Sequence, residues 1–443
     1  MPALTINSNS QLGIPMKEDF NKKLEKRSIG SFRSNGDLKT LLPEDIFSSL
    51  FDPIPDNLDV RKLITIPNSN GKHYLNNAAF GRAYDEVLTL SSKLRLFAET
   101  NPDTFYDQAC LPLIDNTYDV LEDFFDTDKI VLVPNCSFGL RSIMERLVRE
   151  KQHRVVAQLA PIYGATQKLL EFYRTNGDVD KVLKISPGRG HSALLEEDPN
   201  VIVEALEDAF ALQEFSVLFC DQVASQTGRI LPLEPVTRFC NENNIILVVD
   251  GTQSCQLFFG KNKKNILNVD YFVMSTHKWI SNVKTCGFVL FKDQDRPPIP
   301  PAISFGWEVA KRQLATSVEK VRNMFQWQGM LDSYIPYITL AKALKIFSKY
   351  GEAQLITASG ILTHGISDVL HRKPLLTPKS INSRVINILE LKSAQFENMK
   401  DISTIQNAFQ VKYIFPPHIS FHHHLILGLW HQSQCEEVWS GLC

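Results

Sequence analysis

Short apolar runs alternate with longer helical patterns from about residue 71 to residue 308, and this alternation constrains the fold more than any other feature. Each run has the length and the apolar composition of a buried strand. Strands that alternate with helices predict a mostly parallel sheet between helices, which is the α/β class. The runs lie at residues 130–133, 155–158, 217–220, 245–249, 271–274 and 287–291.

The chain is long enough to bury a large core and to form two domains. It has 443 residues, of which 44% are hydrophobic and 22% are charged, an ordinary globular composition. Residues 1–70 are polar and rich in Pro, Asn and Ser, which predicts an N-terminal arm. Residues 71–308 are expected to form the large domain, and residues 309–443 a smaller α+β C-terminal domain with an atypical end.

The overall charge gives no attraction to nucleic acid or to an anionic membrane. The formal net charge is −2 at pH 7, so we expect neither partner. The first twenty residues lack the charged-then-apolar layout of a secretory signal, and no apolar run has the length of a membrane span. A cytoplasmic location is the resulting expectation.

The cysteines and histidines give no sign of a metal site. The eight cysteines lack the paired spacing of a zinc site and the density of a disulfide framework, so they indicate buried apolar side chains. His422, His423 and His424 are consecutive, and consecutive side chains point in different directions on a helix or a strand. We therefore expect no bound metal.

Two side chains at strand ends match the demands of pyridoxal phosphate (PLP) chemistry. Asp250 ends one apolar run and Lys278 follows another, 278 − 250 = 28 positions later. A buried carboxylate keeps the cofactor's pyridine nitrogen protonated, so that the ring withdraws electrons. A buried lysine amine has a lowered pKa and can form a Schiff base with the cofactor's aldehyde. Alone, Asp250 also fits a turn or helix cap, and Lys278 a solvated surface charge; together they indicate a PLP site.

Motifs around these two residues occur in the order of a known family. They are YLNNAAFG at 74–81, DQVASQTGRILP at 221–232, VVDGTQ at 248–253 and STHKW at 275–279. The chain resembles the class V aminotransferases of PLP fold type I. Within that family, HKW and the segment FQWQGMLD at 325–332 are more similar to the isopenicillin N epimerase-like branch than to the cysteine desulfurases.

The resemblance covers the chain from about Tyr74 to about Ala343 and implies an architecture. The large domain would hold a mostly parallel, seven-stranded type of sheet with PLP at the carboxyl ends of its strands. The protein would be a homodimer with its active sites at a two-fold interface, and the N-terminal arm would pack over the partner subunit.

A polar turn after the first apolar run is the expected phosphate site. Free backbone N–H groups at a helix start bind phosphate, and the resemblance assigns this role to Asn135, Cys136 and Ser137. An ordinary helix cap would use the same residue types. Ser275 and His277 flank the lysine, and both could donate hydrogen bonds to the phosphate.

Other site residues follow from the resemblance. Gln253 corresponds to a position that bonds the cofactor's phenolic oxygen, and Tyr163 to an aromatic stacked on its ring, although a core tyrosine fits the local sequence equally well. Ser225 corresponds to a position near a substrate or cofactor oxygen. Asn77, with Asn76, lies in the substrate-entry segment, where an Asn pair can also form a simple turn.

Two features depart from the family pattern. The family usually has Gly-Thr where this chain has Gly329 and Met330, and that threonine reaches the phosphate bound by the partner subunit. Methionine cannot donate this hydrogen bond, which leaves the Gly329 backbone. Residues 415–443 contain no arginine, although related enzymes clamp the substrate carboxylate with one in this region. Arg372 and Arg384 are the candidate clamps elsewhere.

The sequence therefore predicts a PLP-dependent enzyme that acts on an amino acid or related amine through a Schiff base on Lys278. The freed lysine would act as the base that shuttles a proton at the α-carbon. Lyase or epimerase-like chemistry is favoured over class V transamination, although one fold hosts many reactions. A catalytically impaired protein with a binding or structural role is the alternative, motivated by Met330 and the tail.

Overall fold

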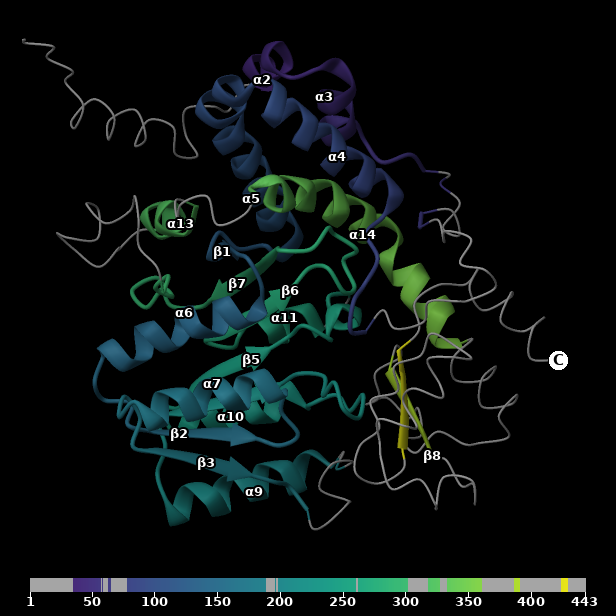
Figure 1. The fold of residues 1–443 in the computed structure, drawn as a ribbon. Coiled ribbons are helices and arrows are strands. Elements are labelled where there is room, and N and C mark those ends of the chain that lie inside the picture. Colours follow the sequence, from purple (N-terminus) through teal and green to yellow (C-terminus); the bar gives the residue numbers. More distant parts are fainter. Residues whose placement is uncertain are drawn as a thin grey trace, which may run out of the picture.

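The computed structural model describes residues 35–56, 58, 63–64, 78–188, 196, 198–259, 262–301, 318–326, 333–360, 386–390 and 424–428. A seven-stranded sheet with the order β1-β7-β6-β5-β4-β2-β3 forms its centre (Figure 1). Neighbouring strands are parallel from β6 to β3, whereas β7 is antiparallel to both β1 and β6. The strands are β1 (Ile130–Val133), β2 (Val155–Leu159), β3 (Lys181–Ile185), β4 (Val217–Asp221), β5 (Ile246–Asp250), β6 (Tyr271–Ser275) and β7 (Gly287–Phe291).

Helices cover both faces of this sheet. Helices α6 and α7 lie on one face, α9 and α10 on the other, and α2 to α5 gather with α14 beyond the β1 and β7 end (Figure 1). The helices are α2 (Asn35–Leu41), α3 (Glu44–Phe51), α4 (Asp85–Thr100), η2 (Thr104–Ala109), α5 (Cys110–Phe125), α6 (Cys136–Arg149), α7 (Gly164–Thr175), α9 (Pro199–Leu212), α10 (Leu233–Glu242), η3 (Cys255–Leu257), α11 (Asn262–Leu267), α13 (Val318–Gln326) and α14 (Ile335–Gly360).

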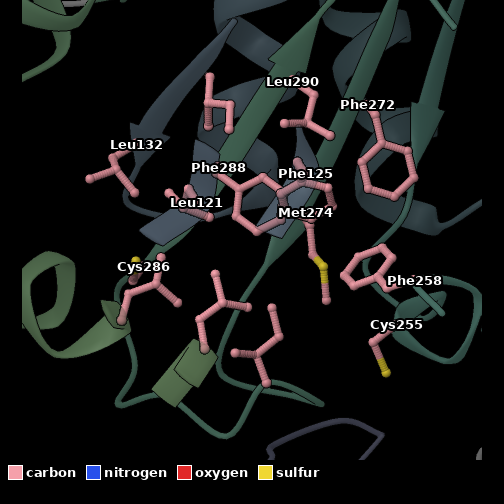
Figure 2. Close-up of a cluster of buried hydrophobic side chains, with 14 of the residues drawn as sticks. Leu121, Phe125, Leu132, Cys255, Phe258, Phe272, Met274, Cys286, Phe288 and Leu290 are labelled. Atoms are coloured by element: carbon pink, nitrogen blue, oxygen red, sulfur yellow. The ribbon is translucent and has the colours of Figure 1, made fainter. Parts of the chain in front are cut away.

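The strands divide their apolar side chains between two cores because successive residues point to opposite faces. Phe219 and Val248 pack in the core under α6, whereas Cys220 and Val249 pack in the larger core under α5, α10 and α14. Figure 2 shows part of the larger core, where the Phe125 ring lies 5.2 Å from the Phe288 ring, between ring centroids. A strand buried on both faces needs a continuous apolar run, which is what the sequence contains.

The predicted α/β fold is confirmed, and each of the six predicted runs forms a strand of this sheet. The seventh strand, β3, was missed. Its sequence, KVLKI, has lysines at two of its five positions, and it lies at the sheet edge beside β2 alone. β3 is only partly buried, whereas β1 at the other edge is buried throughout, so β3 lacks the apolar run by which the other strands were found.

The two helices that the structure describes between residues 318 and 360 pack on the central fold. Arg322 of α13 is buried, donates from Nε to the Ile130 carbonyl oxygen at 3.0 Å and pairs with Glu122 at 2.8 Å. Helix α14 packs along α5 and α4. Beyond it, β8 (Ile386–Glu390) pairs with β9 (His424–Gly428), so His424 begins a strand opposite Glu390. None of the helices within the described ranges is both long and apolar enough to cross a membrane.

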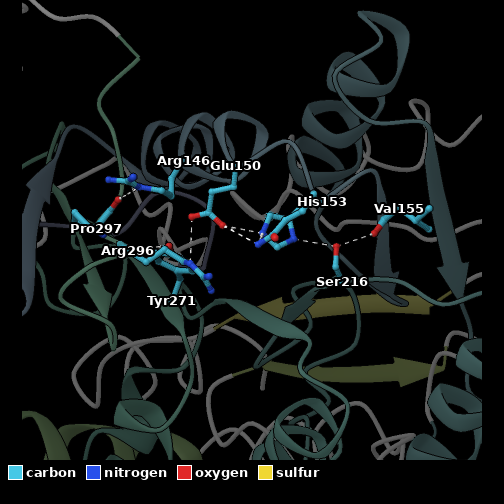
Figure 3. Close-up of polar contacts among 9 residues, drawn as sticks. Arg146, Glu150, His153, Val155, Ser216, Tyr271, Arg296 and Pro297 are labelled. Carbon is cyan, nitrogen blue, oxygen red and sulfur yellow. Dashed lines mark hydrogen bonds and ion pairs between the residues drawn. The ribbon is translucent and has the colours of Figure 1, made fainter. Parts of the chain in front are cut away.

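A polar network fixes the far end of α6 to the sheet (Figure 3). His153 contacts the Ser216 hydroxyl through Nδ1 at 3.0 Å and Glu150 through Nε2 at 2.9 Å. Glu150 also pairs with Arg296 at 3.1 Å, and Arg146 donates to the Pro297 carbonyl oxygen at 2.6 Å. Because α6 is one continuous helix, contacts at its C-terminal end also position its first turn, which lies at the carboxyl ends of the strands.

Candidate active site

The carboxyl ends of β1, β4, β5 and β6 meet at one edge of the sheet. Asp221 ends β4 and Asp250 ends β5, and the two residues are partners in register. Val133 of β1 and Ser275 of β6 both pair with Gly287, the first residue of β7. This is the edge at which open α/β sheets bind ligands.

The turn between β1 and α6 lies at this edge. The Asn135 side chain accepts a hydrogen bond from the Phe138 N–H at 2.9 Å, so it caps α6. The Cys136 N–H donates to the Ser275 hydroxyl oxygen at 3.0 Å, which ties the turn to the end of β6. Ser137 is exposed in the first turn of α6. A helix start of this kind is suited to binding an anion, and the Ser275 hydroxyl lies beside it.

Asp250 is buried on the face of the sheet that α6 covers. It points to this face because it lies two residues after Val248, whose side chain packs in the core under α6. It is 8% exposed, and its Oδ1 accepts the Thr252 N–H at 2.9 Å. The Cys136 thiol lies beside it: burial raises the pKa of Cys136, and the charge of Asp250 raises it further.

Lys278 is half-buried in the turn after β6. Its Nζ lies 5.8 Å from the centroid of the Tyr163 ring, which comes from the start of α7. Burial lowers the pKa of the Lys278 amine, and the nearby acidic groups, Asp250 first, oppose that shift. A lowered pKa leaves more of the amine in the unprotonated, nucleophilic form.

A segment far away in the sequence closes over the lysine turn. A Cβ atom on Gly81 would overlap the carbonyl oxygens of His277 and Lys278, so the backbone at Gly81 lies directly on the lysine backbone. The Lys284 amine donates to the Gly81 carbonyl oxygen at 3.3 Å. The last residues of the 74–81 motif therefore form part of the site.

Gln253 is held by protein groups on both sides of its amide. Its Nε2 donates to the Ala78 carbonyl oxygen at 3.0 Å, and its Oε1 accepts the Trp279 indole N–H at 2.6 Å. These bonds connect the segment at Ala78 with the residue after Lys278. The structure thus gives Gln253 a bridging role that its sequence position did not indicate, and one amide N–H remains beyond the Ala78 bond.

His277 lies in the same turn and is partly buried. Burial, with Lys278 and Lys284 nearby, lowers the pKa of His277 to about 4. The imidazole is therefore neutral at pH 7 and has a single N–H to donate. It can supply a hydrogen bond to a phosphate but no positive charge.

Asp221 is the residue that the sequence analysis missed. It is 5% exposed, faces the same side as Asp250, and its Oδ1 has no hydrogen-bond partner within the described parts of the chain. The signal was present, because VLFCD at 217–221 ends in an acid in the same way as ILVVD at 246–250. Ser225 lies half-buried in the turn that follows, which the Val223–Ile230 bridge closes.

Several predicted residues lie outside the described ranges. These are Asn76, Asn77, Gly329, Met330, Arg372 and Arg384, together with His422 and His423. The structure brings together the others: Asn135, Cys136, Ser137, Ser275 and Asp250 at the strand ends, and Lys278 with Tyr163, His277 and Gln253 around the lysine turn.

The loop after Lys278 contains a strained residue. Thr285 has φ +74°, in the left-handed region that β-branched residues avoid, and glycine adopts this conformation without a steric penalty. Thr285→Gly is therefore expected to raise the free energy of unfolding by about 1 kcal/mol. Thr89→Gly, in the exposed middle of α4, should lower it by about 0.5 kcal/mol. Thermal denaturation of both variants tests the assignment, which is wrong if Thr285→Gly lowers the melting temperature.

The residues at this edge fit the cofactor for which they were proposed. A helix start and the Ser275 hydroxyl suit its phosphate, and a lysine of lowered pKa lies beside an aromatic ring. Asp250 is a buried carboxylate available to a pyridine nitrogen, and the buried Asp221 Oδ1 still requires a polar partner. Fold and site together define the class of PLP-dependent proteins of fold type I.

Comparison with known sequences shows a family resemblance. The class V aminotransferase profile matches residues 191–404, just under half of the chain, and this stretch contains Asp221, Asp250 and Lys278. Over these residues the chain is similar to the class V aminotransferase family. The similarity supports pyridoxal phosphate as the cofactor and an enzyme as the kind of protein.

Two curated relatives carry different enzyme names. Isopenicillin N epimerase of Amycolatopsis lactamdurans is 29% identical over 167 residues, which are 35% of this chain and 40% of that protein. Hercynylcysteine sulfoxide lyase of Schizosaccharomyces pombe is 22% identical over 166 residues, 37% of this chain and 41% of that protein. The matches thus span about two fifths of the length of these relatives.

Solved structures share the fold over most of the chain. A NifS-like protein superposes with a TM-score of 0.65 at 16% identity, covering 84% of this chain and 98% of its own. A mutant of C-DES with glycine covalently linked to its PLP cofactor gives a TM-score of 0.66 at 15% identity, covering 87% of this chain and 99% of its own. At such identities the likeness shows the fold alone.

Proposed function

We propose that this protein is a lyase or an epimerase that acts on an amino acid or related amine, with Lys278 as the residue to which PLP is attached. The observation that carries the proposal is the Lys278 amine: it is half-buried with a lowered pKa, and it lies 5.8 Å from the Tyr163 ring. The names of the two curated relatives, an epimerase and a lyase, favour these reactions over transamination.

Most residues of the site would bind and orient the cofactor. When bound, the cofactor withdraws electrons from the α-carbon of the substrate. Asp250 supplies the buried negative charge that a protonated pyridine nitrogen requires, and the start of α6 with Ser275 binds the phosphate. The Tyr163 ring restricts the orientation of the cofactor ring by stacking.

Lys278 is the proposed base at the substrate α-carbon. Its lowered pKa favours the unprotonated amine, the form that can accept the α-proton and return it. An epimerase would return the proton to the other face of the carbon, whereas a lyase would release a leaving group from the neighbouring carbon.

Reductive trapping tests the attachment site. The purified chain is incubated with PLP, treated with borohydride to make a lysine–pyridoxal link permanent, digested and analysed by mass spectrometry. The expected result is a pyridoxyl group on the peptide that contains Lys278. A label confined to other lysines, or none at all, would overturn the proposal and favour a catalytically impaired protein.

A substrate panel separates the reactions. Sulfur amino acids, other amino acids, amines and small peptides are incubated with the PLP-loaded protein. Inversion at the α-carbon with unchanged mass identifies an epimerase, and release of a fragment identifies a lyase. Product formation only when a keto acid is added would instead identify a class V transaminase.

We also infer that the protein is a cytoplasmic homodimer. Its N-terminal arm would end near residue 70, and its large domain would end near residue 308, where the small domain begins. Phe80 is 62% exposed beside the lysine turn, and Leu88 and Leu96 of α4 are 55% and 69% exposed, as expected of side chains that a partner subunit covers. Light scattering of the full chain tests this inference, and a monomeric mass would count against it.

A further inference from the structure

We propose that Asp221 is a second carboxyl of the cofactor site, one that forms with Asp250 a pair carrying a single negative charge and that holds the Tyr163 turn in position. Asp221 would be a positioning residue and Asp250 the group that faces the cofactor. The proposal rests on the proposed function only in naming the ligand as PLP.

The geometry of the sheet places the two carboxyls side by side. Asp221 and Asp250 are the last residues of adjacent parallel strands and are partners in register. Residues in register point to the same face, and the packing of Phe219 and Val248 identifies that face as the one under α6. Both side chains are at least nine-tenths buried, at 5% and 8% exposure.

Two neighbouring carboxylates in a buried site cannot both ionise without strong repulsion, so such pairs share a proton. Burial and the unpartnered oxygen of Asp221 decide which carboxyl keeps it. Asp250 Oδ1 accepts the Thr252 N–H at 2.9 Å, whereas the buried Asp221 Oδ1 has no hydrogen-bond partner in the described residues, so a charge on Asp221 would be poorly solvated. The proton therefore belongs on Asp221.

The groups that face Asp221 agree with this assignment. Burial raises the pKa of Asp221 well above its usual range, and the neighbouring charge of Asp250 raises it further. A hydrogen bond from the Tyr163 N–H and the charges of Lys278 and Arg229 act in the opposite direction, but they are smaller influences. The Cys220 thiol on the same strand is buried and its pKa is raised, so it adds no charge.

Asp221 also belongs to a set of contacts that hold the turn before α7. The Asp221 carboxyl lies near the Tyr163 N–H. The Arg229 guanidinium donates to the Ala160 carbonyl oxygen at 3.2 Å, and the Gln226 amide donates to the Ile162 carbonyl oxygen at 3.0 Å. All three side chains come from the segment 221–229. Tyr163 is 47% exposed, and these contacts fix the backbone of the turn from which its ring extends.

Two substitutions separate the charge of Asp221 from its contacts. Asp221→Asn is neutral and keeps an oxygen for the Tyr163 N–H, so the PLP dissociation constant should stay within about threefold of the wild type. Asp221→Ala removes the contact and should weaken PLP binding about tenfold. Asp250→Asn removes the negative charge and should weaken it by about 10- to 100-fold. Equilibrium dialysis with the full chain measures all three, and Asp208→Asn, on the exposed surface of α9, is the matched control.

The pH dependence of stability tests whether Asp221 holds the proton, and it needs no cofactor. Since the folded-state pKa of Asp221 is raised above its ordinary value of 3.8, the native state binds more protons than the unfolded state above pH 3.8. Stability must then fall as the pH rises from 3.8 through the folded-state pKa. We expect the melting temperature of the cofactor-free wild type to fall as the pH rises over this window. In Asp221→Asn the fall should be smaller.

These measurements can overturn the inference separately from the proposed function. A loss of PLP affinity in Asp221→Asn as large as in Asp250→Asn would show that Asp221 carries the charge. Wild-type affinity and an unchanged pH slope in Asp221→Ala would place Asp221 outside the site. If PLP is trapped on no lysine, the proposed function fails, while the pH slope still decides the protonation of Asp221.

Discussion

Replacing Lys278 by alanine is expected to lower turnover of an amino substrate by about 10²–10⁴-fold, the range over which a positioned acid–base group contributes. The reason is specific to this site. The amine is half-buried next to Asp250, and no other lysine is near enough to the Tyr163 ring to form a cation–π contact within the described residues. Single-turnover kinetics with a substrate identified from the panel measure the loss.

Two further variants separate charge from proton transfer at this position. Lys278→Arg keeps a positive charge, but arginine stays protonated and cannot accept a proton, so its turnover should be as low as that of Lys278→Ala. Lys168→Ala, an exposed lysine of α7, should keep wild-type turnover. An active Lys278→Arg would contradict the role of the lysine as a base.

The sheet was predictable because its strands are buried on both faces. Six strands read as apolar runs, and their ends gave the place of Asp250 and Lys278 without any knowledge of contacts. Strand β3 was missed because the exposed residues Lys181 and Lys184 interrupt its apolar pattern. Burial, rather than strand propensity, decided which strands could be predicted from the sequence.

The site was predictable in part, because single residues report their chemistry but not their neighbours. The pairing of Asp221 with Asp250 depends on the sheet order, which places β4 beside β5. The bond between Gln253 and Trp279 joins residues 26 positions apart, and the position of Gly81 on the lysine backbone joins residues almost 200 apart. Such contacts arise from topology and leave no local signal.

The resemblance to a family was predictable for a different reason. The residues proposed to bind the cofactor lie at strand ends, and they occur in a fixed order along the chain, so they form recognisable motifs. The substrate would be bound by side chains such as Asn77 and Arg372, which lie outside the described residues. The reaction therefore has to be found by experiment with substrates.

The second large effect is expected from Gly81→Ala. The new methyl group would overlap the carbonyl oxygens of His277 and Lys278 and would lie 2.6 Å from the Lys278 Cα. These are backbone atoms of a turn held by a buried bridge from Asn282, whose amide donates to the Pro336 carbonyl oxygen at 2.8 Å, so the turn cannot rotate away as a side chain would. Overpacking of this kind lowers the free energy of unfolding by about 1–3 kcal/mol.

The loss of function in Gly81→Ala should exceed the loss of stability. Moving the Lys278 backbone by about 1 Å misplaces the amine, and misplacement on this scale lowers turnover about 10²-fold. Gly164→Ala is the matched control: it lies at the start of α7, where an added Cβ meets no atom within 4 Å, and it should raise stability by about 0.5–1 kcal/mol. Melting temperatures and turnover are measured for both proteins with PLP bound. If Gly81→Ala kept wild-type turnover, the segment at residues 78–81 would not press on the lysine turn, and the arrangement of the site around Lys278 would need revision.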